Sequence, residues 1–93
     1  MIVGVLTVEL FLPSTGSLKD KRQIIKSLKD RVRQRFNVAI AEVDEQDLWQ
    51  KAVVGVACVG NKTPFVHEVL DKVVQLMRAT PLVEIVDHRV DLI

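Results

Sequence analysis

The residues best suited to bind a charged ligand are the lysines and arginines of residues 17–37, SLKDKRQIIKSLKDRVRQRFN. This window holds eight basic and two acidic side chains, so its formal charge is +6. The whole chain has 13 Lys and Arg and 12 Asp and Glu, which leaves five basic and ten acidic side chains, or −5, outside the window. Such a concentration of positive charge in a nearly neutral protein indicates an anionic partner.

Five of these cations recur at spacings of three, four, three and four residues, which keeps side chains on one face of a helix. We call them the basic stripe: Lys19, Arg22, Lys26, Lys29 and Arg33. The stripe would be about 21 Å long at 1.5 Å per residue. Asp20 and Asp30 lie off its centre, so we expect them to neutralise it poorly. A row of this length suits the phosphate backbone of a polyanion, and we expect the partner to be RNA or a ribosome.

Two alternatives account for the same pattern. The stripe could be a solvated helix surface, or it could pair with the acidic remainder of the chain, including that of a neighbouring subunit in a structural oligomer. If RNA binds, it should be recognised through its backbone, because the chain has no Tyr and the strands expected at the centre offer only Phe11 for stacking.

A second candidate site is the loop that leads into the same helix. Gly16, Ser17, Lys21 and Arg22 could hold one phosphate group, since backbone N–H groups at a helix N-terminus bind anions. The protein would then be a small enzyme or sensor for a phosphorylated metabolite. The glycine pattern matches no phosphate-loop motif, so an ordinary capped loop is the alternative, with Ser17 as N-cap and Asp20 in the capping-box position.

Other side chains give weaker signals. Glu42 and Asp44 should point to the same side of a strand, and with Glu45 and Asp47 they could hold Mg²⁺. Without a His or a second acidic cluster at ligand spacing, the favoured interpretation is a solvated turn or salt bridges to basic residues. Cys58 stands in an apolar run and should be a buried, inert thiol. No Ser/His/Asp or Cys/His set is recognisable, so we predict a non-enzymatic protein with no metal or cofactor.

The elements that position these residues follow from hydrophobic periodicity. Strands are predicted over residues 1–12, 38–43, 52–59 and 82–92, and helices over residues 18–36 and from Thr63-Pro64 to Thr80-Pro81. The order βαββαβ in a single domain, residues 1–93, predicts an α+β, ferredoxin-like fold with two helices on one face of a four-stranded antiparallel sheet.

Two of the predicted strands, residues 1–12 and 52–59, are apolar on both faces, whereas helices can cover only one face of the sheet. We therefore expect a homo-oligomer formed through the open sheet face. The apolar start of the chain carries Glu9 and is too short to span a bilayer, so we expect no membrane partner. A single cysteine fits a cytoplasmic location.

Four short motifs resemble the YlxP-like family of small bacterial proteins of unknown function. They are SLK-x-KR at the helix start, R-x-R-F-N at its end, and the A-E-V-D and Q-D-L-W-Q segments that follow. The resemblance covers about the whole chain and implies a ferredoxin-like domain. In several bacteria the genes of this family lie beside those for transcription elongation, translation initiation and ribosome maturation factors, which favours an RNA or ribosome role by association. The family has no established catalytic residues, and Lys19, Arg22 and Arg33 are the motif positions on the basic stripe.

Overall fold

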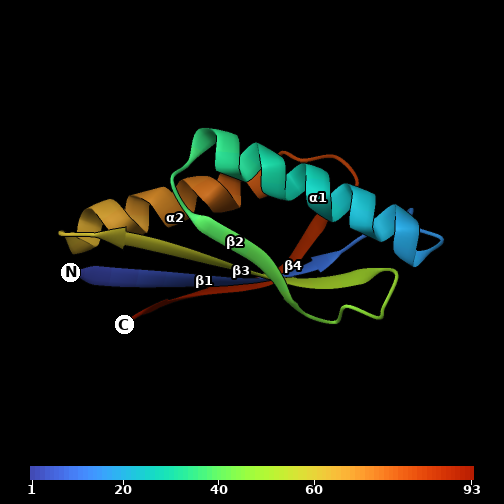
Figure 1. Cartoon of the computed structure of the whole chain (residues 1–93), viewed down its shortest axis with the longest axis horizontal. Coiled ribbons are helices and arrows are strands. Elements are labelled where there is room, and N and C mark those ends of the chain that lie inside the picture. Colours follow the sequence, from blue (N-terminus) through green and yellow to red (C-terminus); the bar gives the residue numbers. More distant parts are fainter.

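One four-stranded sheet carries two helices on one of its faces (Figure 1). The structure is a computed structural model that describes residues 1–93. Its elements in chain order are β1 (Ile2–Phe11), α1 (Leu18–Arg35), β2 (Ala39–Asp44), β3 (Lys51–Gly60), α2 (Thr63–Arg78) and β4 (Glu84–Leu92). The strand order is β2-β3-β1-β4, and every neighbouring pair is antiparallel. The predicted ferredoxin-like α+β fold is confirmed.

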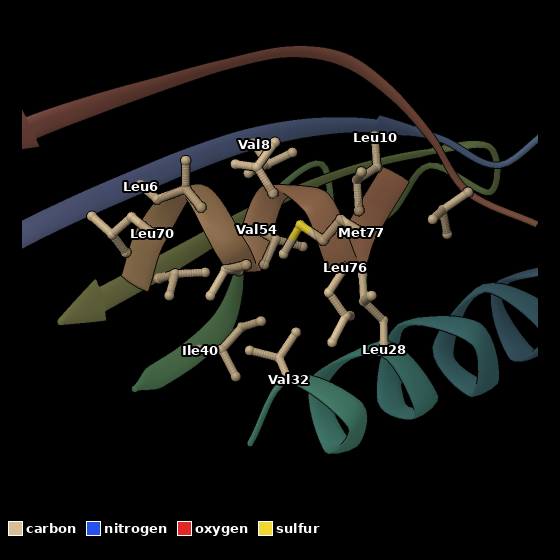
Figure 2. Close-up of a cluster of buried hydrophobic side chains, with 14 of the residues drawn as sticks. Leu6, Val8, Leu10, Leu28, Val32, Ile40, Val54, Leu70, Leu76 and Met77 are labelled. Carbon is tan, nitrogen blue, oxygen red and sulfur yellow. The ribbon is translucent and has the colours of Figure 1, made fainter. Parts of the chain in front are cut away.

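The hydrophobic core lies between the sheet and the helices. Along β1, Leu6, Val8 and Leu10 are buried at alternate positions, and Val54 and Val56 do the same on β3. Period-2 alternation sends these side chains to one face, where they meet the apolar faces of α1 and α2 (Figure 2). The resulting cluster contains 19 buried hydrophobic residues. The two central strands therefore supply much of the sheet side of the core.

The predicted start of α1 is confirmed. Ser17 is the N-cap, and its Oγ accepts a hydrogen bond from the Asp20 N–H at 3.1 Å. The Asp20 carboxylate accepts in return from the Gly16 N–H at 3.3 Å. The first bond satisfies an N–H of the first turn that has no partner within the helix, and the second engages the N–H of the residue before the cap. Together they fix the residue at which α1 begins.

The sheet face opposite the helices, which we call the outer face, has no cover from the described residues (Figure 1). Its central side chains, Val3, Val5, Val53 and Ala57, are only partly buried. Val59 and Val86 are 59% and 64% exposed. The sequence pattern thus correctly indicated that the central strands are apolar on both faces. Neither helix of the structure has the length and hydrophobicity needed to cross a membrane.

Two irregularities interrupt the strand pairing. The register shifts between Glu42 and Asp44 on β2, and between the positions opposite Glu9 and Leu10 on β4. Glu42 pairs with Val54, a core residue, whereas Asp44 pairs with Val53 on the outer face. The expectation that both carboxylates share one side of the strand is therefore wrong, because the bulge adds a residue and breaks the alternation.

The close approach of β1 to α2 gives a testable prediction. A methyl group on Gly4 would lie 2.9 Å from Leu70 Cδ1 and would also press on Val66. Gly4→Ala should therefore lower the free energy of unfolding by about 1–3 kcal/mol, the usual effect of overpacking. Guanidinium denaturation followed by circular dichroism measures it.

Gly16→Ala is the matched control, because a methyl group there has only Asp20 nearby, at 3.9 Å. We expect its free energy of unfolding to stay within about 1 kcal/mol of the unmodified protein. Equal stability of the two variants would contradict the tight β1–α2 packing.

Candidate functional site

The basic stripe lies along the side of α1 that borders β2. The core side of the helix is formed by Ile25, Leu28 and Val32. Arg33 Nη2 donates to the Ile40 carbonyl of β2 at 3.1 Å, whereas Arg31, on the other side of the helix, reaches Thr80 just beyond α2. Four residues of the stripe are exposed and Lys29 is half-buried. The helix therefore presents the predicted row of cations to solvent.

Asp30 lies closer to the stripe than helical spacing indicated. Its carboxylate is 3.4 Å from Lys26 Nζ and 3.8 Å from Arg33 Nη1. These pairs are exposed, and such pairs contribute about 0–1 kcal/mol each. Lys19, Arg22 and Lys29 have no carboxylate within 4.0 Å. Part of the stripe is thus weakly paired within the helix, and the remaining cations are free.

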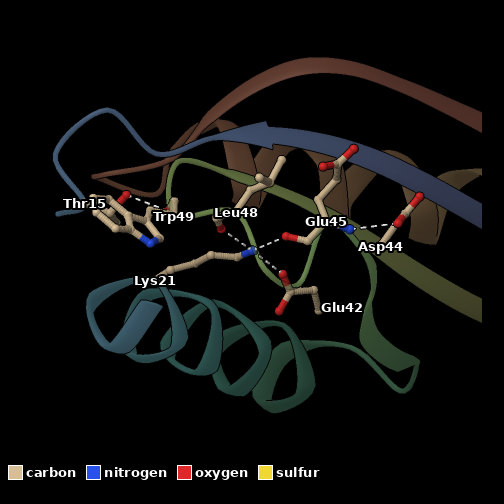
Figure 3. Close-up of polar contacts among 7 residues, drawn as sticks. All are labelled: Thr15, Lys21, Glu42, Asp44, Glu45, Leu48 and Trp49. Carbon is tan, nitrogen blue, oxygen red and sulfur yellow. Dashed lines mark hydrogen bonds and ion pairs between the residues drawn. The ribbon is translucent and has the colours of Figure 1, made fainter. Parts of the chain in front are cut away.

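Lys21, on the buried side of α1, has a different role from the cations of the stripe. Lys21 is 1% exposed, and its Nζ lies 2.6 Å from the Glu45 carbonyl oxygen and 2.7 Å from that of Leu48. The same Nζ is 2.8 Å from Oε2 of Glu42, an oxygen with no other polar partner (Figure 3). A buried ammonium is stable only when it is paired and its three N–H donors have acceptors. Lys21 therefore joins α1 to β2 and to the loop that follows β2.

The position of Lys21 explains its burial. It precedes Ile25 by four residues and Leu28 by seven, so it belongs to the core-facing side of the helix. Glu42 follows the buried Ile40 by two residues and points to the same side of β2. The sequence predicts Lys21 in an anion-binding loop, whereas its ammonium turns toward β2. The helical spacing from Ile25 was the signal that could have revealed this position.

The groups of the loop before α1 are already engaged in contacts within the chain. The Gly16 N–H binds Asp20, and Ser17 Oγ caps the helix. Thr15 is buried, with its hydroxyl 2.9 Å from the Leu12 carbonyl and 2.7 Å from that of Trp49. Arg22 points to solvent while Lys21 is buried, so the four residues of the proposed anion site do not converge on one point.

Lys21 binds the loop between β2 and β3 through the backbone carbonyls of Glu45 and Leu48. Glu45 has a φ of 61°, a left-handed conformation that costs a non-glycine residue about 1–2 kcal/mol. Its carbonyl accepts from Lys21, and its N–H donates to Asp44 Oδ1 at 2.8 Å. Leu48 and Trp49 are 44% and 54% exposed. Of the four carboxylates considered as metal ligands, Asp44 accepts from the Glu45 N–H and Glu42 pairs with Lys21, so the salt-bridge interpretation is confirmed for Glu42.

Cys58 is buried on the core side of β3, as predicted. Burial removes water from the thiolate and so raises the pKa of the thiol. A thiol in this environment is a poor nucleophile at neutral pH. Cys58 therefore acts as a small hydrophobic core residue.

The buried ion pair gives a second prediction. Lys21→Met keeps the apolar stem but leaves Glu42 mostly buried without a cation, so the free energy of unfolding should fall by about 3 kcal/mol. Replacing both partners, Lys21→Met with Glu42→Leu, should recover much of that loss, because an apolar pair leaves no unpaired charge. Denaturant titration read by Trp49 fluorescence and circular dichroism tests both variants.

Lys19→Met, two residues earlier on the exposed side of α1, is the control and should change stability by less than about 0.5 kcal/mol. A Lys21→Met protein as stable as this control would show that the contacts of the buried ammonium do not stabilise the fold.

Two comparisons with known proteins place the chain in a family. The model of a family described as "Protein of unknown function (DUF503)" matches residues 3–90. The "Uncharacterized protein YlxP" of Bacillus subtilis (strain 168) is 32% identical over 83 residues, which cover 89% of this chain and 90% of that protein. The resemblance carried by the four sequence motifs is thereby confirmed. The chain belongs to the DUF503 family of proteins of unknown function.

Proposed function

We propose that this protein is a non-enzymatic, cytoplasmic RNA- or ribosome-associated protein that contacts the phosphate backbone through the basic stripe. The observation that carries the proposal is the row of cations on the solvent-facing side of α1, three of which have no carboxylate partner. A linear array of cations on one face is the electrostatic footprint of a nucleic-acid-binding surface.

The geometry of the stripe supports contact with a chain of phosphates. From Lys19 to Arg33 it extends about 21 Å, so that several phosphates could be contacted at once. Arg22 and Arg33 at two points along it can each bind a phosphate bidentately. Lys26 and Arg33 could exchange Asp30 for a phosphate at low cost, because exposed ion pairs are weak.

The attachment of α1 to β2 also favours binding. Lys21 fixes the N-terminal half of the helix through Glu42, and Arg33 fixes the C-terminal half through the Ile40 carbonyl. A helix held at both ends presents its cations in a fixed row. Less conformational entropy is then lost when the ligand binds.

The small-anion alternative has less support. The Gly16 N–H that would face a phosphate already donates to Asp20, and the carboxylate of Asp20 would repel an anion at that position. The test below also distinguishes the alternative in which the stripe pairs with the acidic loop of a neighbouring subunit. This alternative predicts salt-sensitive assembly without RNA binding.

The test is a salt series of binding to ribosomal subunits and to bulk structured RNA. Five phosphate contacts should make log K fall with log salt concentration at a slope of roughly −3.5 to −4.5. Lys19→Gln with Arg22→Gln removes two free cations, so the slope should become shallower by about 1.4–1.8. Binding to subunits alone would identify a ribosomal surface as the target.

Lys62→Gln with Arg78→Gln is the matched control, because both cations are exposed at the ends of α2 and outside the stripe. It should leave the slope unchanged. The proposal fails if the protein does not bind at low salt, or if both double variants bind RNA as tightly as the unmodified protein.

A further inference from the structure

The outer face of the sheet carries an apolar patch that none of the 93 residues covers. Both helices lie on the opposite side (Figure 1). Strands β1 and β3 contribute Val3, Val5, Val53, Ala57 and Val59 to this face, and β2 contributes Ala39 and Ala41. An uncovered apolar face of this kind marks an interaction surface.

We infer that this face binds the same face of a second copy of the chain, so that two sheets pack together between outer layers of helices. The area fits such an interface. The strands have 10, 10, 9 and 6 residues, and at about 3.3 Å per residue and about 4.8 Å between strands they give a face of about 550 Å². Two such faces bury about 1,100 Å², which exceeds the roughly 1,000 Å² expected of a biological interface.

The shape of the face suits another sheet. Small residues occupy much of it, with Gly55 between Ala41 on β2 and Thr7 on β1. Sheets that pack face to face lie about 10 Å apart with their strands roughly aligned. A shallow hollow at one end, lined in part by Phe11, Val53 and Val86, could receive a side chain of the second copy.

The charges at the rim favour a second copy over an unlike partner. Glu9 on β1 lies directly opposite Asp87 on β4, and neither has a cation within 4.0 Å. Like charges in this arrangement destabilise a sheet. If a two-fold axis lies in the plane between the two sheets and runs perpendicular to the strands, β4 of one copy lies over β4 of the other copy, with the opposite chain direction. Arg89, which lies two residues after Asp87 and whose Nε is 3.4 Å from Asp91 Oδ2 of its own strand, would then approach these carboxylates in the other copy. It could exchange Asp91 for them at low cost, because exposed ion pairs are weak.

This inference does not depend on RNA binding. In the paired arrangement both helices of each copy stay on the outside, so the basic stripe remains exposed. Loss of RNA binding and loss of self-association are therefore separate results.

Sedimentation equilibrium on the full chain, from about 1 to 100 µM, tests the inference. The expected molar mass at high concentration is twice the 10.5 kDa of one chain. Val5→Lys should weaken the dimer about 100-fold or more, since one ammonium from each copy would have to be removed from water when the interface forms. The folded monomer should tolerate this change, because Asp91 lies directly opposite Val5 on β4.

Arg89→Ala is a second, milder variant that changes no apolar contact at the centre of the face, and it should weaken the dimer about tenfold. Leu82→Lys is the matched control: Leu82 is 55% exposed on the helix side of the molecule, and its replacement should leave the dimer unchanged. Circular dichroism confirms that each variant is folded. A monomer at 100 µM, or a dimer that Val5→Lys leaves as tight as Leu82→Lys does, overturns the inference.

Discussion

The buried ammonium of Lys21 is the interaction on which the arrangement of α1 depends. Removing a charge from water is costly, and the cost is offset only if an opposite charge and hydrogen-bond acceptors are already in place. Here they come from Glu42 on β2 and from two carbonyls of the loop after β2. Together with the core contacts of Ile25, Leu28 and Val32, this one side chain holds α1 against an edge strand and against the loop that follows it.

Most of the fold could be predicted from the sequence, because its elements have strong and regular patterns. The alternation in β1 and β3 and the helical spacing of Ile25, Leu28 and Val32 identify elements that bury one face. The Ser17 cap fixes the start of α1 in the sequence as it does in the structure. Given two helices and four strands in this order, few arrangements bury all of their apolar faces.

The details of the candidate site were harder to predict, because they depend on contacts between distant segments. Lys21 looks like one of several cations until Glu42, 21 residues away, is known to face it. The bulge that separates the sides of Glu42 and Asp44 leaves no mark in the local pattern, since it follows from pairing with β3. Asp30 reaches the stripe because flexible side chains extend beyond the positions that a helical wheel assigns to their Cβ atoms.

The burial of Lys21 also has a chemical consequence. Acylating reagents and acyl donors in the cell react with unprotonated amines that they can reach, and the amine of Lys21 is both enclosed and hydrogen-bonded. The six other lysines of the chain are all more exposed. Acylation of Lys21 therefore requires the contact between α1 and β2 to open, and its rate would measure local unfolding at this contact. Acylation of the lysines on the stripe would measure only their exposure at the surface.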